Sequence, residues 1–205
     1  DIINDSIGFV ADLVEDRAYE GMRSLHDDLY SVIKAATFFS ENNGNYADGV
    51  VTALGIDGLA EALRLMRSQT GEDGRPIDVR PHLLLVPPSL EATARSIIAS
   101  ITVNRADAAG DNMPTANPWS SLNLKLHIEP RLAAAHGGSD TAWYLVADPA
   151  IVPAFNISFL DGKEYPTVEQ NAAEFNLLGE QWRVFFDYGI DEAEHRSIVK
   201  MKGTI

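Results

Sequence analysis

Cysteine is absent from the 205-residue sequence, which excludes disulfide bonds, thiolate metal sites and a cysteine nucleophile. The chain also has no apolar run that approaches the roughly 18 to 20 residues needed by a membrane-spanning helix. Neither a secretory signal nor an arginine-rich transit segment stands at its start. We therefore expect a protein that suits a reducing cytoplasm and does not bind a membrane.

Basic residues are few in this chain. It has 16 Lys and Arg against 30 Asp and Glu, which gives a formal net charge of −14 and a pI near 4.6. Binding to nucleic acid through its phosphates requires clustered Lys and Arg, and the sequence has no such cluster. An acidic surface keeps subunits soluble and repels DNA, so we expect no specific nucleic-acid binding.

The sequence also lacks a recognisable catalytic motif. Ser24, His26 and Asp27 have the residue types of a hydrolytic triad, but side chains this close on one helix point in different directions. A solvated helix surface explains them better. The histidines show no HExxH or HxH spacing, so a structural or surface role is expected for all five: His26, His82, His127, His136 and His195.

Two further stretches resemble ligand sites only in composition. Residues 42–49, NNGNYADG, offer oxygen atoms for calcium, but their spacing does not match an EF-hand loop and turn-forming asparagines explain them better. The buried-strand pattern of residues 82–86 leads directly into a helix, a junction that holds phosphate in many proteins. Here Pro87-Pro88 stands in place of the glycines that such a site needs. We expect no cofactor, no metal and no catalysis.

A long helix is the clearest structural signal. Apolar residues recur at steps of three and four from Ser6 to about Ala36, which predicts one continuous helix of roughly 45 Å. Two helices with an unmarked break are the alternative, although no proline or strong turn signal supports a break. We expect one face of the helix to pack against a sheet from the C-terminal third, through Val10, Val14, Leu25 and Leu29.

The middle of the chain predicts two more helices and a long loop. Asp57 is the expected cap of the second helix, and Ser89 is the expected cap of a third at 89–101. Residues 103–121 are polar and have no clear period, which predicts a loop. A functional loop with an exposed Trp119 and a merely mobile loop explain this stretch about equally well.

The second half changes to a period of two. In residues 122–128, leucines and Ile128 alternate with polar side chains, which predicts a strand with one wet face. Asp161-Gly162 is a hairpin-turn signal. Helices first and strands later favour an α+β fold. Further strands are expected at 141–147, 155–160, 181–188 and 195–201.

Five segments in order along the chain carry a family resemblance: DGRPIDVRPHLLLVPPSLEATARSIIAS, NPWSSLNLKLHIEPRL, TAWYLVADPA, ISFLDGKEYPTVEQ and EQWRVFFDYGIDEAEHRSIVKMKG. Together they resemble the major capsid (head) proteins of Mu-like tailed phages and prophages, some of which follow a prohead protease in one polyprotein. The resemblance spans nearly the whole chain. It implies the Hong Kong 97-like shell fold, in which a peripheral domain has a long spine helix and a sheet, and an axial domain mixes sheet and helices.

The resemblance also implies a division of the chain. Residues 1–49 would hold the spine helix and the start of the peripheral domain, residues 50–150 the axial domain, and residues 151–205 the strands that return to the peripheral domain. The segment at 103–121 would then be a candidate subunit-contact loop. Its candidate contact residues are Asn104, Asp111, Asn117 and Trp119.

The function implied by the resemblance is that of a structural subunit, which self-assembles into capsomers of a virion capsid and is made in the bacterial host cytoplasm. Its partners would be other copies of itself, with scaffold and portal proteins. A small α+β hydrolase or ligand-binding protein, with a site that the sequence does not show, is the alternative.

Related subunits carry an N-terminal arm and an extended loop before the spine helix, whereas this sequence begins at Asp1, directly before the helix. No residues for a covalent cross-link between subunits can be assigned. Together with the charge of −14, this predicts a monomer or a weak small oligomer whose association rises with salt.

Overall fold

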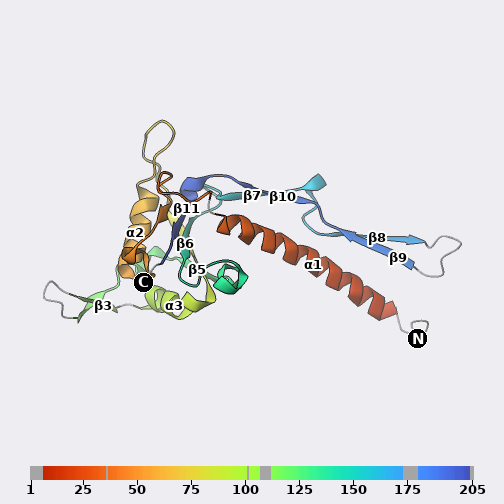
Figure 1. Cartoon of the computed structure of the whole chain (residues 1–205), viewed down its shortest axis with the longest axis horizontal. Helices are drawn as coiled ribbons and strands as arrows, with labels where there is room; N and C mark the ends of the chain where they lie inside the picture. The colour runs from red at the N-terminus through yellow and green to blue at the C-terminus, as the bar shows by residue number, and fades with distance from the viewer. Residues whose placement is uncertain (1–6, 36, 101, 107–111, 173–179, 204–205) are drawn as a thin grey trace. The chain divides into compact units, whose positions relative to one another are not determined.

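The computed structural model describes residues 7–35, 37–100, 102–106, 112–172 and 180–203. The chain forms two compact units (Figure 1). The helix–ribbon unit comprises Asp1–Val32 and Asn156–Asp191, and the sheet unit comprises Ile33–Phe155 and Glu192–Ile205. The division expected from the sequence cuts the chain at other positions, because its first and last segments each contribute to both units. That division remains a prediction about domains of a shell subunit.

Helix α1, Ile7–Lys34, is a single helix of 28 residues, as the apolar period predicted. At 1.5 Å per residue it is about 42 Å long. Leu25 is buried and Leu29 is half-buried, whereas the side chains of Val10 and Val14 lie outside the described residues. Gly21 faces the C-terminal part of the same unit, since a Cβ there would lie 3.1 Å from Cγ of Pro166.

The strands of the helix–ribbon unit form two separate pairs. Strand β7, Phe155–Phe159, pairs with β10, Tyr188–Glu192, and β8, Thr167–Ala172, pairs antiparallel with β9, Glu180–Phe185. The predicted strand 181–188 is therefore wrong as one element, because it breaks at Phe186-Asp187. Stacking of Phe159 on Phe186, with ring centroids 5.8 Å apart, joins the two pairs at this break.

The Asp161-Gly162 signal marks a turn but not a hairpin between its neighbouring strands. Both residues have a positive φ inside a short 3-10 turn, η7, Leu160–Gly162. The strands on either side, β7 and β8, each pair with a later strand rather than with each other.

The sheet unit contains a five-stranded sheet with the strand order β1-β11-β6-β2-β5. The inner pairs β11–β6 and β6–β2 are antiparallel, and the outer pairs β1–β11 and β2–β5 are parallel. The strands span Tyr46–Ala47 (β1), Pro81–Val86 (β2), Lys125–Ile128 (β5), Trp143–Ala147 (β6) and Ile198–Met201 (β11).

Helices α2, Ile56–Arg67, and α3, Glu91–Ala99, pack on one face of this sheet. Their buried residues and alternate residues of the three inner strands form the core: Leu59, Ala62, Leu63, Met66, Leu84, Val86, Ala94, Ile97, Trp143, Leu145, Val199 and Met201. On the other face, Phe39 contacts Tyr144 with ring centroids 5.6 Å apart, and Phe38 contacts both Phe39 and Phe155. The inner strands are therefore covered by apolar or aromatic groups on both faces, as the apolar run of β2 predicted.

Both predicted helix caps are wrong. Helix α2 follows Gly55, so Asp57 lies inside its first turn. There its negative charge interacts favourably with the positive end of the helix dipole. Ser89 lies in the 3-10 turn η3, Pro88–Leu90, ahead of α3, and its Oγ donates to the Asp140 carbonyl at 2.5 Å. The remaining 3-10 turns are η2 (Val50–Thr52), η4 (Ser120–Leu122), η5 (Pro130–Leu132), η6 (Ala134–His136) and η8 (His195–Ser197).

The predicted loop at 103–121 contains a hairpin. Strands β3, Thr102–Ala106, and β4, Asn112–Ala116, are antiparallel, with Thr102 opposite Ala116. Backbone hydrogen bonds between two strands do not depend on side-chain pattern, so a ladder of small and polar residues has no apolar period to reveal it.

Candidate subunit-contact surfaces

The four residues singled out from the sequence do not form one exposed loop. Asn104 lies in β3 opposite Pro114, and Asp111 lies outside the described residues. Asn117 is buried, and its Nδ2 donates to the carbonyls of Ile97 at 2.6 Å and Ser100 at 2.8 Å. Asn117 therefore fixes the base of the β3–β4 hairpin to the end of α3.

Trp119 is half-buried against the core, which corrects the expectation that it is exposed. Its backbone N–H donates to Oδ1 of Asn117 at 3.0 Å, and its indole Nε1 donates to the Ile56 carbonyl at 3.2 Å. Asn117 and Trp119 thus connect the segment after the hairpin to α3 and to the start of α2 by hydrogen bonds within the chain. A contact between subunits made by the hairpin itself remains a prediction.

The Ser, His and Asp residues considered from the sequence form no catalytic or metal-binding centre in the described part of the chain. Ser24, His26 and Asp27 are all exposed on α1. Three histidines have a neighbouring carboxylate: His82 and Asp148 are 4.0 Å apart, His127 and Glu129 3.6 Å, and His195 and Glu194 3.4 Å. Within the described ranges, no three His, Asp or Glu side chains are grouped so that they could hold a metal ion.

The most connected polar network surrounds Asn45, in the sheet unit. Asn45 is fully buried, and its Nδ2 donates to the carbonyls of Phe38 and His195, both at 3.1 Å. Its Oδ1 accepts from the backbone N–H of Ser40 at 3.0 Å. One amide side chain therefore joins the segment that follows α1 to the residues that precede β11.

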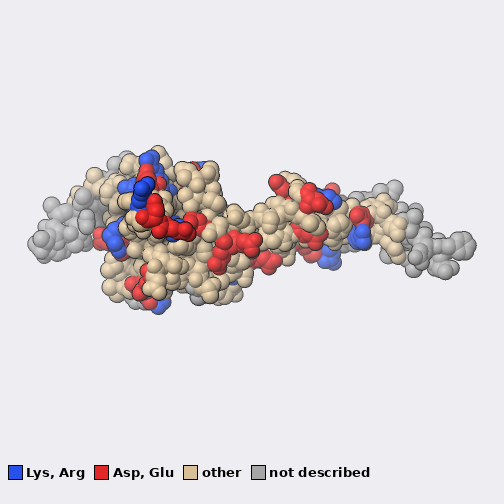
Figure 2. Space-filling model, turned by 90° about the horizontal axis from the view of Figure 1, so that it is seen from above, with Lys and Arg blue, Asp and Glu red and all other residues tan. Residues whose placement is uncertain are grey.

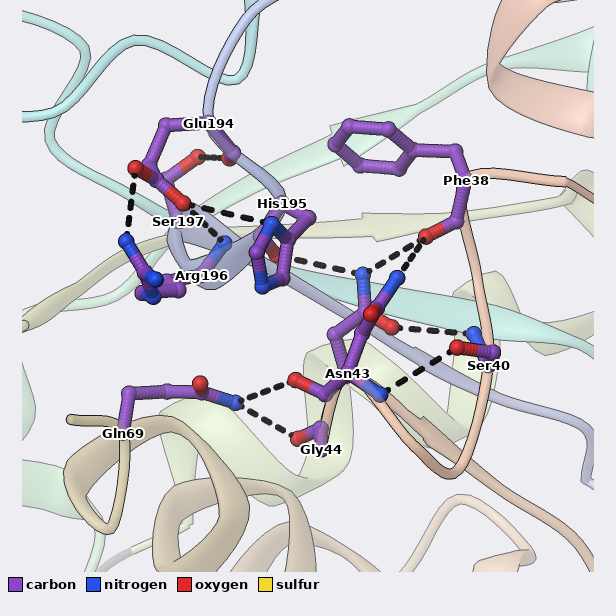
Figure 3. A network of polar contacts seen from close by, with 10 residues as sticks. Phe38, Ser40, Asn43, Gly44, Gln69, Glu194, His195, Arg196 and Ser197 are labelled. Carbon is purple, nitrogen blue, oxygen red and sulfur yellow. Dashed lines mark hydrogen bonds and ion pairs between the residues drawn. The ribbon is translucent and has the colours of Figure 1, made fainter. Parts of the chain in front are cut away.

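Figure 3 shows how neighbouring side chains extend this network. Gln69, just beyond α2, donates to the carbonyls of Asn43 at 3.2 Å and Gly44 at 2.7 Å. Gly44 has a φ of 63°, and a Cβ there would lie 3.0 Å from Nε2 of Gln69, so this turn favours glycine. On the other side, Glu194 pairs with Arg196 at 3.1 Å. These contacts satisfy backbone groups, so we interpret the network as structural.

Exposed apolar side chains are distributed unevenly. Among the described residues, ten large apolar side chains are exposed, and seven of them belong to the helix–ribbon unit. That unit contributes only Leu25 and Tyr30 to the buried apolar residues of the described chain. The seven exposed residues are Tyr19, Ile157, Leu160, Tyr165, Val168, Trp182 and Phe185.

Charge is also distributed unevenly. The helix–ribbon unit has 15 acidic and 4 basic residues, a net charge of −11, whereas the sheet unit has 15 acidic and 12 basic residues, a net charge of −3. Figure 2 shows one face of the molecule, on which Asp and Glu side chains outnumber Lys and Arg. The helix–ribbon unit therefore combines a strong negative charge with exposed apolar side chains.

The β8–β9 ribbon has two chemically different faces. The register pairs Val168 with Val184, Gln170 with Trp182 and Ala172 with Glu180, so these positions share one face of the ribbon. Val168 and Trp182 are about two-fifths exposed, at 39% and 40%.

The opposite face of the ribbon carries Thr167, Glu169, Arg183 and Phe185. Arg183 donates to Glu169 through Nε at 2.6 Å, and its guanidinium lies 5.5 Å from the centre of the Phe185 ring. The two charges of this face are therefore matched with each other.

The chain matches the phage capsid protein family over residues 1–201, nearly its whole length. It belongs to the phage capsid protein family. The family is one of structural proteins of the virion, and membership implies assembly with other copies of the chain. No curated protein and no solved structure matches the chain.

For a capsid protein, the surfaces that contact other copies are the functional sites. The exposed apolar residues of the helix–ribbon unit are therefore the relevant candidates, and sequence reasoning did not find them. The sequence predicted a strand at 181–188, which contains Trp182, but it could not show whether another element covers that side chain. None of the described helices is long and apolar enough to cross a membrane.

Proposed function

We propose that this chain is the self-assembling major head subunit of a tailed phage or prophage, with the Hong Kong 97-like fold. In this proposal α1 is the spine helix, the helix–ribbon unit is the peripheral domain, and the sheet unit is the axial domain. The Mu-like subgroup, with a prohead protease preceding some of its members, is the part of the family that the sequence resembles. Scaffold and portal proteins are the further partners, and the subunit is made in the host cytoplasm.

The observation that carries this proposal is the exposed apolar surface of the helix–ribbon unit. Two-stranded β pairs are marginally stable alone, and exposed apolar groups at this density mark surfaces that bind other proteins. Seven of the ten exposed large apolar side chains lie in this unit, which comprises one third of the chain. A subunit completed by its neighbours explains both features.

Salt dependence tests the proposal. Because each copy carries a charge of −14, approaching copies repel one another at low ionic strength, and salt screens this repulsion within about 10 Å at 0.1 M. In sedimentation velocity we expect a monomer or weak small oligomer in dilute low-salt buffer and larger species as sodium chloride rises. Negative-stain imaging of the larger species should show rings or curved sheets of subunits.

The opposite outcome would count against a shell subunit. A chain that stays monomeric at every salt and protein concentration up to its solubility limit does not have self-complementary contacts. Irregular aggregates that still form when Trp182, Val168 or Tyr165 is substituted would likewise contradict specific assembly. These exposed side chains are part of the surface that the proposal assigns to subunit contacts.

A further inference from the structure

The stretch NNGNYADG, residues 42–49, contains the one Asn-Gly pair of the sequence, Asn43-Gly44. Glycine has no Cβ to shield its backbone nitrogen, so that nitrogen reaches the side-chain amide of a preceding asparagine more easily than any other residue's does. Glu41 and Asn42 are exposed, and Asn43 and Gly44 are half-buried, so solvent reaches this turn. The pair therefore has the composition and the access to water that loss of a side-chain amide requires.

The fold holds both reacting groups of this pair in hydrogen bonds. The N–H of Gly44 donates to the Glu41 carbonyl at 3.0 Å. The side-chain Nδ2 of Asn43 donates to the Phe38 carbonyl at 3.4 Å, so the amide is turned toward Phe38 (Figure 3). Both contacts must break before the Gly44 nitrogen can meet Cγ of Asn43.

Gln69 holds the turn closed from the end of α2. Its side chain is buried, and its Nε2 donates to the carbonyls of Asn43 at 3.2 Å and Gly44 at 2.7 Å. The backbone carbonyl of Gln69 accepts from the Ile77 N–H at 3.0 Å, so Gln69 is itself held in place. One fixed amide group therefore bonds the peptide groups of both residues of the pair.

We propose that Asn43 is a site of spontaneous deamidation, and that Gln69 controls the reaction by holding the turn closed. In the reaction the Gly44 nitrogen loses its proton and bonds to Cγ of Asn43, while the side-chain nitrogen takes up a proton and leaves as ammonia. Water then opens the resulting succinimide at either carbonyl, which gives aspartate or isoaspartate. Water is the co-reactant, and no group is oxidised or reduced.

The products change the polar network around Asn45. Either acid adds one negative charge to the −14 of the chain. Isoaspartate also lengthens the backbone by one carbon at residue 43, where Gln69 donates, and next to Asn45, which bonds the Phe38 and His195 carbonyls. We therefore expect deamidated copies to unfold at a lower urea concentration than unmodified copies.

Mass spectrometry of the chain incubated at mildly alkaline pH measures aspartate and isoaspartate at residue 43 over time. We expect the folded wild type to deamidate about tenfold or more slowly relative to the same chain unfolded in urea, because only the open turn reacts. Asn42 is the internal standard, since it is exposed and followed by asparagine, and it should react more slowly than Asn43 in urea.

The variant Gln69→Ala tests the control of the turn. While still folded, it should deamidate about three to ten times faster than the folded wild type, because the turn opens more often. In urea the two chains should react at the same rate. The matched control is Gln181→Ala, which removes an exposed glutamine of the helix–ribbon unit and should leave the rate at Asn43 unchanged.

A urea series on the wild type does not depend on any variant, and it decides the matter if Gln69→Ala does not fold. Opening of this turn alone exposes little surface, so below the unfolding transition the deamidation rate should change little with urea. A rate that rises as steeply as the global unfolding equilibrium would show that the turn opens only when the sheet unit unfolds, and would overturn the role of Gln69.

Three further results would contradict the proposal. Equal rates in folded and unfolded wild type would mean that the fold does not protect Asn43. Equal rates in folded wild type and folded Gln69→Ala would mean that Gln69 does not control the turn. Gly44→Ala should react more slowly in urea, where the turn imposes no strain on it, and an unchanged rate would exclude the succinimide. None of these outcomes bears on the proposed function, since the reaction involves no contact between copies.

Discussion

The helix–ribbon unit and the sheet unit contain equal numbers of acidic residues, 15 each, but the first has 4 basic residues and the second 12. In the sheet unit at least seven of the 15 carboxylates pair with a Lys or Arg, as in Glu61–Arg64, Asp78–Arg80 and Glu91–Arg95. Its five-stranded sheet is covered on both faces by apolar groups. The helix–ribbon unit has a large excess of negative charge, and its described residues form strand pairs with few buried side chains.

This difference separates two ways in which a chain can bury apolar surface. The sheet unit completes its core from its own residues, as a domain that folds alone does. The helix–ribbon unit leaves Trp182, Val168 and Tyr165 at its surface, and in the proposed function neighbouring copies cover these side chains. Its negative charge opposes that assembly until salt or a correctly matched surface compensates.

The sharpest test of the comparison is one substitution made in both units. Leu145 is fully buried in β6, at the centre of the sheet, and Leu145→Ala should lower the free energy of unfolding by about 3–5 kcal/mol. Leu160, in the helix–ribbon unit, is 61% exposed, and Leu160→Ala should cost less than about 1 kcal/mol. Urea unfolding measures both, and similar costs would contradict the comparison.

The Asn45 network is the second test, because it belongs to the sheet unit alone. Asn45→Ala leaves the Phe38 and His195 carbonyls and the Ser40 N–H without their partner, in a buried place. We expect a loss of about 2–4 kcal/mol. Asn43→Ala is the matched control, since Asn43 is half-buried and its side-chain contact with Phe38 is longer, at 3.4 Å. If the two variants unfold at the same urea concentration, the network is not the link we describe.

Sequence patterns predicted the elements that have an apolar period. Helix α1 shows it through Leu25, Leu29 and Ile33, and strands β2 and β6 show it as short apolar runs, so all three were expected close to their actual bounds. The β3–β4 hairpin was missed because its stability comes from backbone pairing, which small polar residues conceal. The break at Phe186-Asp187 was missed because alternation continues through it.

The candidate contact residues were harder to predict for a different reason. Exposure depends on which elements pack together, and a tryptophan in a polar stretch gives no sign of this. Trp119 was expected to be exposed but donates a hydrogen bond to the Ile56 carbonyl, whereas Trp182, within the strand expected at 181–188, is 40% exposed. Asn45 was noted only as a turn former, because its three partners come from distant parts of the sequence.

Alkaline pH should affect the sheet unit through Tyr144. Burial raises the pKa of its hydroxyl from 10.0 to about 12. Below pH 10 both states keep the proton, and the contribution of Tyr144 to stability is complete. Between pH 10 and 12 the unfolded chain releases the proton while the folded chain keeps it, so stability falls as pH rises. The loss should reach about 2–3 kcal/mol near pH 12.

The variant Tyr144→Phe isolates this effect. Lys200, whose ammonium lies 5.9 Å from the Tyr144 ring centre, acts in the opposite direction, because burial lowers its pKa and stability rises as it loses its proton. The comparison of wild type with Tyr144→Phe removes the lysine contribution common to both. Urea midpoints at pH 9 and pH 11 should fall less for the variant, and parallel curves would show that Tyr144 does not titrate in this range.

The smallest expected effect lies in the helix–ribbon unit, where Tyr188 joins β10 to α1. Its hydroxyl donates to Oδ2 of Asp28 at 2.6 Å, and partial burial, together with this hydrogen bond, raises the pKa of the hydroxyl. Because the contact is open to solvent, Tyr188→Phe should cost less than about 1 kcal/mol, and global unfolding is a poor measure of it. Hydrogen exchange is better suited, since the contact links α1 to a strand 160 residues away. Amides near Asp28 should exchange about two to five times faster in Tyr188→Phe, while those of β6 in the sheet unit stay unchanged.

The matched control is Tyr165→Phe, at a tyrosine that is 72% exposed in the same unit, and it should alter neither set of amides. Faster exchange in β6 would mean that the two units unfold as one, which would remove the contrast between them.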